Sequence, residues 1–209
     1  MTAEDAAAIC EHTQRLQSGA RILIAGCGTS RVVDRLALLC PGAEVVACDI
    51  SDVVIAQGKA RCSTGRNSNV VFAKGDARDM REFSSGSFDL VLDKGTFAAL
   101  EAVSLAEEVP AFCESHRLLK ESGVLVTVGL GYPCGELLQL MRDRRVAWEV
   151  EAKGKVAGVR SDCVAFVLRP VQETEFDEHV PVRYFADDLT WDDSEAEEVV
   201  VRGGVLAKR

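Results

Sequence analysis

The sequence has little that would suit a membrane, a metal centre or a nucleic-acid backbone. No apolar run in the chain approaches the roughly 20 residues that a membrane-spanning helix needs. The eight cysteines stand singly, without the paired C-x-x-C spacing of zinc or redox sites. There are 24 lysines and arginines against 33 acidic residues, and a formal net charge of −9 disfavours a phosphate backbone as partner. We therefore expect no metal ion, no membrane and no nucleic acid among its partners.

The first residues also lack the basic segment and apolar core of a signal peptide. We therefore expect a cytoplasmic protein whose cysteines are reduced and serve as small core residues. With 209 residues, 47% of them hydrophobic, the chain has enough material for one well-buried domain. Acidic residues gather near the carboxyl end, so we predict a domain over residues 1–170 and an acidic extension over 171–209. The sequence predicts no oligomeric state.

One stretch, RILIAGCGTS at 21–30, organises the rest of the chain. The apolar run 22–25 leads directly into Gly26-Cys27-Gly28, which predicts a buried strand ending at a glycine turn. Thr29 or Ser30 can then cap a helix, so that the turn presents backbone N–H groups at the mouth of a sheet. Such a mouth binds a nucleotide-like ligand.

The residues around this turn narrow the kind of ligand. Arg31 stands where the dinucleotide fingerprint G-x-G-x-x-G needs its third glycine, and no Gly-Lys-Ser/Thr follows to make a phosphate loop. Asp49 lies about twenty residues beyond Gly28, at the end of the next apolar run, where a carboxylate can accept both ribose hydroxyls. The pattern favours an adenosine ligand without a diphosphate, of which S-adenosylmethionine is the commonest.

Further apolar runs and turn signals predict alternating strands and helices. We expect helices over 3–17, over 30–39, from Ser51-Asp52 onward and within 97–120, where Pro110 marks the first turn of a second helix. A short helix should follow Pro133. The expected strands are 21–25, 44–48, 70–73, 88–92 and 124–128, followed by an antiparallel pair at 146–150 and 163–168.

This alternation predicts a parallel sheet with helices on both faces, to which the final hairpin adds an antiparallel strand. Ligands of such sheets bind at the carboxyl ends of the strands. Four polar or glycine-rich positions follow strands in this way: 26–30, Asp49, Asp76 and Asp93. They should line one crevice.

Four segments together resemble a known family: ILIAGCGTS (22–30), CDISDVVIAQ (48–57), GDARDM (75–80) and FDLVLDKGTFAAL (88–100). The chain resembles class I S-adenosylmethionine-dependent methyltransferases, and within them the eukaryotic methyltransferase-like proteins marked by an Asp-Lys-Gly-Thr motif. The resemblance implies a Rossmann-like α/β fold with a mostly parallel seven-stranded sheet. Known members methylate lysines, and in one case an N-terminus, on translation elongation factor 1-alpha, and another methylates citrate synthase.

The resemblance also implies roles for individual residues. Gly26 and Gly28 would form the turn against the methionine part of the cofactor, Asp49 would bind the ribose, and Asp76 with Ala77 would contact adenine. The implied cofactor-binding set is Ala25, Gly26, Cys27, Gly28, Ser30, Asp49, Ile50, Ser51, Asp76, Ala77 and Asp93.

The resemblance also implies that Asp93 lines the methyl-donor end. A lysine amine must lose its proton before it can accept a methyl group, and Asp93, Thr96 or a nearby backbone carbonyl could accept a hydrogen bond from it and orient its lone pair. Asp93 and Thr96 are therefore the candidate catalytic residues. A helix cap explains Asp93 equally well. The chain departs from the family pattern at Ile24, where many members have an acid, and at Ala98, where the usual residue is aspartate.

These observations predict a methyltransferase acting on a lysine of a basic protein, with elongation factor 1-alpha as the first candidate. Two alternatives remain: a small-molecule methyltransferase, and a catalytically weakened cofactor-binding regulator, which Ala98 motivates. A nicotinamide-dependent oxidoreductase is disfavoured by Arg31.

Overall fold

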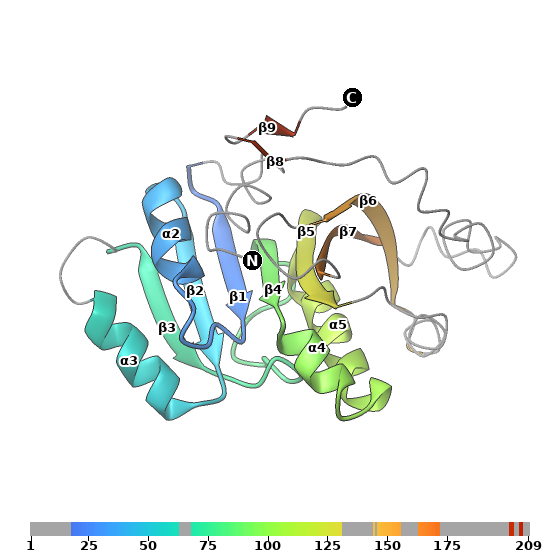
Figure 1. Cartoon of the computed structure of the whole chain (residues 1–209), viewed down its shortest axis with the longest axis horizontal. Helices are drawn as coiled ribbons and strands as arrows, with labels where there is room; N and C mark the ends of the chain where they lie inside the picture. Colours follow the sequence, from blue (N-terminus) through green and yellow to red (C-terminus); the bar gives the residue numbers. More distant parts are fainter. Residues whose placement is uncertain are drawn as a thin grey trace, which may run out of the picture.

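The computed structural model describes residues 18–62, 68–130, 144, 146–155, 163–171, 201–202 and 205–206. Its centre is a seven-stranded sheet in the order β3-β2-β1-β4-β5-β7-β6 (Figure 1). The strands are β1 (Arg21–Ala25), β2 (Glu44–Asp49), β3 (Val70–Lys74), β4 (Phe88–Lys94), β5 (Leu119–Leu130), β6 (Ala147–Lys155) and β7 (Cys163–Val171). The helices are α2 (Val32–Leu39), α3 (Asp52–Cys62), α4 (Thr96–Glu101) and α5 (Leu105–Leu118). A separate two-stranded sheet pairs β8 (Val201–Arg202) with β9 (Val205–Leu206).

The first five strands are parallel, and β7 joins them antiparallel between β5 and β6. The predicted mostly parallel sheet with a terminal antiparallel hairpin is therefore confirmed. From β1 the strand order runs through β2 to β3 at one edge of the sheet, and β4 then lies on the other side of β1. The junction of β1 and β4 is thus the switch point at which open α/β sheets bind ligands.

Helices cover both faces of the sheet, as the alternating pattern predicted (Figure 1). On one face α2 and α3 contribute Val33, Leu36 and Ile55 to a core with the inward side chains of β1 and β2. On the other face α4 and α5 contribute Phe97 and Phe112. Trp148 and Phe166 of the hairpin join this second core, as expected.

Some element boundaries differ from the predicted ones. Pro110 lies inside α5 and not in its first turn, because the helix already begins at Leu105 after Ser104. The apolar side chains of Val109 and Phe112 bury the inner face of this helix and hold it together, although Pro110 has no N–H for an intrahelical bond. Strand β5 begins at Leu119, with a register shift opposite β4, instead of at Val124.

Several expectations concern residues outside the described ones. These are the helix over 3–17, the short helix after Pro133 and most of the acidic extension, including its aromatic residues. Among the described helices, none is long and apolar enough to cross a membrane.

Candidate cofactor and acceptor site

The carboxyl ends of the central strands lie in register, which brings the predicted site residues to one edge. Ala25 of β1 pairs with Cys48 of β2 on one side and with Asp93 of β4 on the other. Asp93 in turn pairs with Thr127 of β5. The loops that follow β1, β2 and β4 therefore leave the sheet at neighbouring points.

The glycine turn after β1 needs glycine for two different reasons. Gly26 and Gly28 have φ angles of 69° and 53°, the left-handed region that other residues rarely adopt. A Cβ on Gly26 would also overlap Thr96 Oγ1 and lie 2.8 Å from its Cγ2, whereas a Cβ on Gly28 would meet nothing within 4 Å. Gly26 is thus required both by its backbone conformation and by close packing against Thr96 of α4, whereas Gly28 is required by backbone conformation alone.

Asp49, at the end of β2, is held by the backbone in an accessible position. The N–H of Gly28 donates to its Oδ2 at 2.8 Å, and the N–H of Ser51 donates to its Oδ1 at 2.9 Å. Each carboxylate oxygen keeps a second lone pair, and the side chain is only partly buried. The carboxylate can therefore accept further hydrogen bonds from a pair of hydroxyls.

Two N–H groups of the turn, which the sequence led us to expect to be free, are used within the protein. The N–H of Cys27 donates to the carbonyl of Cys48 at 2.8 Å, and that of Gly28 is used by Asp49. The N–H of Val32, the first residue of α2, faces Ser30 Oγ at 3.3 Å. The N–H groups of Cys27, Gly28 and Val32 therefore have acceptors within the protein, and the one of Gly28 holds Asp49 beside the turn.

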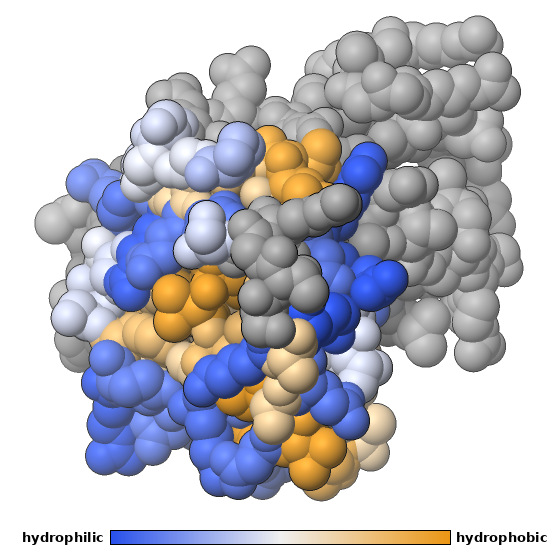
Figure 2. All heavy atoms as spheres, turned by 90° about the vertical axis from the view of Figure 1, so that its left-hand side faces the viewer, coloured by the Kyte–Doolittle hydropathy of each residue, from blue (hydrophilic) through white to orange (hydrophobic). Residues whose placement is uncertain are grey.

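Ile50 and Ser51, which follow Asp49, differ in their surroundings. The side chain of Ile50 is 62% exposed, and Ser51 Oγ accepts the N–H of Val54 at 3.4 Å at the start of α3. Figure 2 views the side of the molecule that carries α3 and β3, and hydrophobic atoms reach its surface there. The exposed apolar residues of this region include Val53 and Val71. Ile50 thus offers an apolar surface beside the Asp49 carboxylate.

The loop after β3 places Asp76 beside Arg78. The Arg78 guanidinium donates to both carboxylate oxygens of Asp76 and also binds Glu107 of α5. Hydrogen bonding from Arg78 holds the pKa of Asp76 below its usual value, so this carboxylate is charged at neutral pH. Ala77 faces the core, and it can offer a ligand only its backbone.

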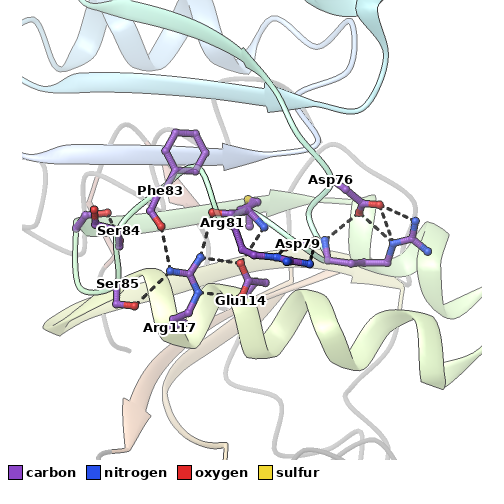
Figure 3. A network of polar contacts seen from close by, with 11 residues as sticks. Asp76, Asp79, Arg81, Phe83, Ser84, Ser85, Glu114 and Arg117 are labelled. Carbon is purple, nitrogen blue, oxygen red and sulfur yellow. Dashed lines mark hydrogen bonds and ion pairs between the residues drawn. The ribbon is translucent and has the colours of Figure 1, made fainter.

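A second arginine fixes the remainder of this loop to α5 (Figure 3). Arg117 donates to the carbonyls of Met80 and Phe83, at 3.0 Å each, and to Glu114. The Glu114 carboxylate also accepts the N–H of Met80 at 2.8 Å. The polar loop 75–87 is thus anchored at several points, and this fixes Asp76 relative to the end of β3.

Asp93 is completely buried, and both of its oxygens are engaged. Its Oδ1 accepts the N–H groups of Thr96 at 2.8 Å and Phe97 at 3.2 Å, and its Oδ2 accepts the hydroxyl of Thr127 at 2.8 Å. Burial raises the pKa of Asp93 to about 6, although these hydrogen bonds act in the opposite direction. Asp93 therefore caps α4 and links it to β5, as the alternative interpretation of this residue predicted.

Three residues of the Asp93-Lys94-Gly95-Thr96 motif have a structural role: Asp93, Gly95 and Thr96. Gly95 adopts a φ of 85°, which turns the chain from β4 into α4. The hydroxyl of Thr96 then donates towards the carbonyls of Ala25 at 3.0 Å and Gly26 at 3.2 Å. The motif thus joins the start of α4 to the glycine turn.

Cys27 does not behave as a reactive thiol. Its side chain is 2% exposed, and burial raises its pKa to about 11. Burial likewise raises the pKa of the Cys48 thiol to about 12. Both are small core residues, as the sequence predicted.

The sequence did not predict three residues of this region. Arg78 forms an ion pair with Asp76, Thr127 donates a hydrogen bond to Asp93, and Glu108 is a buried acid on α5. Arg78 stands next to two predicted site residues and could have been suspected from its charge. Glu108 shares helical spacing with Phe112 and Ser115, which marks it as a core-facing position.

Comparison with known proteins agrees with this architecture. The methyltransferase domain family matches residues 16–173, more than half of the chain. A human eEF1A lysine and N-terminal methyltransferase is 39% identical over 119 residues, which are 57% of this chain and 16% of that protein. A mitochondrial citrate synthase-lysine N-methyltransferase from Pongo abelii is 32% identical over 118 residues, 51% of this chain and 49% of that one. The chain therefore spans only part of the length of these relatives.

A solved structure shares the fold. The TehB-like SAM-dependent methyltransferase from Corynebacterium glutamicum superposes with a TM-score of 0.61 at 22% identity, covering 82% of this chain and 89% of that one. The sheet order, the glycine turn and the family match agree with one another. The chain belongs to the methyltransferase domain family.

Proposed function

We propose that this chain is an S-adenosylmethionine-dependent methyltransferase that acts on a lysine of a basic protein. The observation that carries the choice of cofactor is Asp49, a partly buried carboxylate fixed by two backbone N–H groups beside a turn in which the N–H groups of Cys27 and Gly28 already have acceptors. Such a site binds a ribose and offers little to a pyrophosphate. This combination fits an adenosyl ligand better than a dinucleotide.

The residues present can hold this cofactor in a consistent way. Asp49 would bind the ribose hydroxyls, and Ile50, which is exposed beside it, would cover one face of the adenine. Asp76 and the backbone of Ala77 would contact the adenine edge. The backbone of Ala25, Gly26, Cys27, Gly28 and Ser30 would line the methionine part, and Ser51 would support Asp49.

Bound S-adenosylmethionine supplies a methyl group on a sulfonium, and the protein must align the acceptor amine and exclude water. A near-attack distance of about 3 to 3.5 Å is required, and no covalent nucleophile is needed. Asp93 and Thr96 serve this alignment by joining α4 to the glycine turn and to β5. Because both oxygens of Asp93 are engaged and buried, we assign it a positioning role.

The choice of a protein lysine rests on two supports. The relatives named above carry lysine methyltransferase in their names, and one of them is named for elongation factor 1-alpha. The net charge of −9 favours a basic partner, because opposite charge speeds encounter. Elongation factor 1-alpha is therefore the first candidate acceptor, and the cytoplasm is the proposed location.

Replacing Asp49 by alanine should weaken S-adenosylmethionine binding by about 10- to 100-fold, the range for a hydrogen bond to a charged group. Isothermal titration calorimetry with the cofactor and with NAD measures this directly. The matched control is Asp52→Ala, whose carboxylate is 75% exposed and pairs only with Lys74 among the described residues. An unchanged affinity in a folded Asp49→Ala protein would remove Asp49 from the site, and tighter binding of NAD would refute the choice of cofactor.

Incubation with radiolabelled S-adenosylmethionine and a cell extract tests the proposed substrate class. We expect label in protein, enriched in a basic protein of the translation apparatus. Label confined to small metabolites or nucleic acid would contradict the proposal. An extract in which nothing is labelled, although the chain binds the cofactor, would favour the alternative of a weakened regulator.

A further inference from the structure

Glu108 is a buried acid whose carboxylate is not fully engaged by the protein. The residue is 6% exposed, and its Oε2 has no hydrogen-bond partner among the described residues. Leaving a charged oxygen buried without a partner costs stability, and such groups commonly have a role beyond the fold. Glu108 is therefore a candidate for binding a ligand.

The position of Glu108 places it at the same edge of the sheet as the proposed site. It lies in the first turn of α5, the helix that leaves this edge and leads back to β5. The preceding residue, Glu107, forms an ion pair with Arg78, and Arg78 also pairs with Asp76, which follows β3. One helical turn after Glu108, the ring of Phe112 packs on Phe97 of α4 at a centroid distance of 4.7 Å.

Two acids of neighbouring elements interact with Glu108, namely Glu101 of α4 and Asp93 of β4. Burial, together with the nearby carboxylates of Glu101 on α4 and Asp93 at the end of β4, raises the pKa of Glu108 to about 7. Asp93 makes its hydrogen bonds to Thr96, Phe97 and Thr127, and no hydrogen bond among the described residues joins it to Glu108. A cationic ligand placed here would give Glu108 Oε2 the partner that it lacks among the described residues.

We propose that Glu108 receives the cationic amine of the acceptor, so that the subsite beside α4 selects an alkylammonium group over a neutral one. Before transfer the ammonium gives one proton to the Glu108 carboxylate, and the neutral amine then has the lone pair that attacks the methyl group. This inference rests on the proposed function and refines it, since it assigns recognition of the lysine to a residue of α5. Asp93 then shapes the subsite, and Glu108 supplies the charge that faces the amine.

A titration with n-butylammonium, a mimic of the lysine side chain, tests this without any protein acceptor. Binding is followed by NMR of the chain saturated with S-adenosylhomocysteine and of the chain alone, with n-butanol as the neutral probe. The wild type should prefer n-butylammonium, and Glu108→Gln should lose about tenfold or more of that affinity while butanol binding stays the same. The control is Glu121→Gln, an exposed acid outside the carboxyl edge.

The pH dependence has a definite sign. Ionisation of Glu108 above its pKa of about 7 should strengthen n-butylammonium binding between pH 6 and pH 8, and Glu108→Gln should not show this rise. The other titratable groups to consider are Glu101 and Asp93, with Lys94 next to Asp93. Equal affinity of the wild type for the two probes, or a Glu108→Gln variant that binds n-butylammonium like the wild type, would overturn the proposal.

A second variant guards against a folding defect. Glu108→Leu removes the unpartnered carboxylate and fills a similar volume, so its melting temperature should exceed that of the wild type, more at pH 8 than at pH 5. It should also lose the preference for n-butylammonium. A Glu108→Leu protein that melts lower at pH 8 and keeps the preference would mean that Glu108 serves the fold alone. Because this titration uses no acceptor protein, its failure is distinguishable from a failure of the proposed function.

Discussion

The Asp93→Ala variant should lose methyl transfer by about two orders of magnitude, the effect of a misplacement of about 1 Å at a reacting centre. Alanine would leave the N–H groups of Thr96 and Phe97 and the hydroxyl of Thr127 without their shared acceptor. The start of α4 would then no longer be fixed to β5. Affinity for S-adenosylmethionine should fall much less, because Asp49 and its two N–H contacts are untouched.

The Asp93→Asn variant separates positioning from acid–base chemistry. An asparagine carbonyl can still accept the two N–H groups of α4, and its amide can donate to Thr127 Oγ1, which is able to accept. We therefore expect this variant to keep a rate within about tenfold of the wild type, a far smaller loss than the misplacement caused by alanine. Steady-state kinetics together with calorimetry of cofactor binding provides both measurements. A loss as large in Asp93→Asn as in Asp93→Ala would contradict a pure positioning role.

The Gly26→Ala variant should be destabilised by about 3 kcal/mol and should bind cofactor poorly. A left-handed backbone costs other residues about 1 to 2 kcal/mol, and forcing an extra methyl into packed surroundings typically costs about 1 to 3 kcal/mol more. The added methyl would meet the side chain of Thr96, which holds the carbonyls of Ala25 and Gly26. Urea denaturation measures the loss of stability, and calorimetry measures the loss of binding.

Two controls isolate the packing contribution. Gly28→Ala also has a positive φ, but open space surrounds the added methyl, so only the backbone cost of about 1 to 2 kcal/mol should appear. Thr96→Ala removes two of the three clashing atoms and should therefore destabilise the Gly26→Ala protein less than it destabilises the wild type. If the losses of unfolding free energy from the two substitutions are additive, the methyl group added at position 26 does not clash with the Thr96 side chain.

The sequence predicted the sheet and the meeting of the candidate site residues at one edge, because both follow from local patterns. Parallel strands bring their carboxyl ends to one edge, so Asp49 and Asp93 could be placed together from the apolar runs before them. The spacing of Asp49 from Gly28 predicted a carboxylate beside the glycine turn, and the hydrogen bond between them at 2.8 Å places it there. The two glycine positions of the turn were found for the same local reason.

The remaining features depend on contacts between distant segments. Thr127 lies 34 residues from Asp93, and only the register of β4 against β5 brings the two together. Glu107 and Glu108 look alike in the sequence, but the helix turns the first outward to Arg78 and the second towards the core. The start of α5 was missed because Pro110 was read as a boundary, while burial of Val109 and Phe112 outweighed its helix-breaking tendency.

The most direct test of the account is to incubate the purified chain with methyl-labelled S-adenosylmethionine and purified elongation factor 1-alpha, and then to identify the modified amino acid. The account predicts label in ε-methylated lysine, strongly reduced for Asp93→Ala and retained for the Asp52→Ala control. Label on another amino-acid type, or an unlabelled factor in the presence of a labelled small molecule, would contradict it.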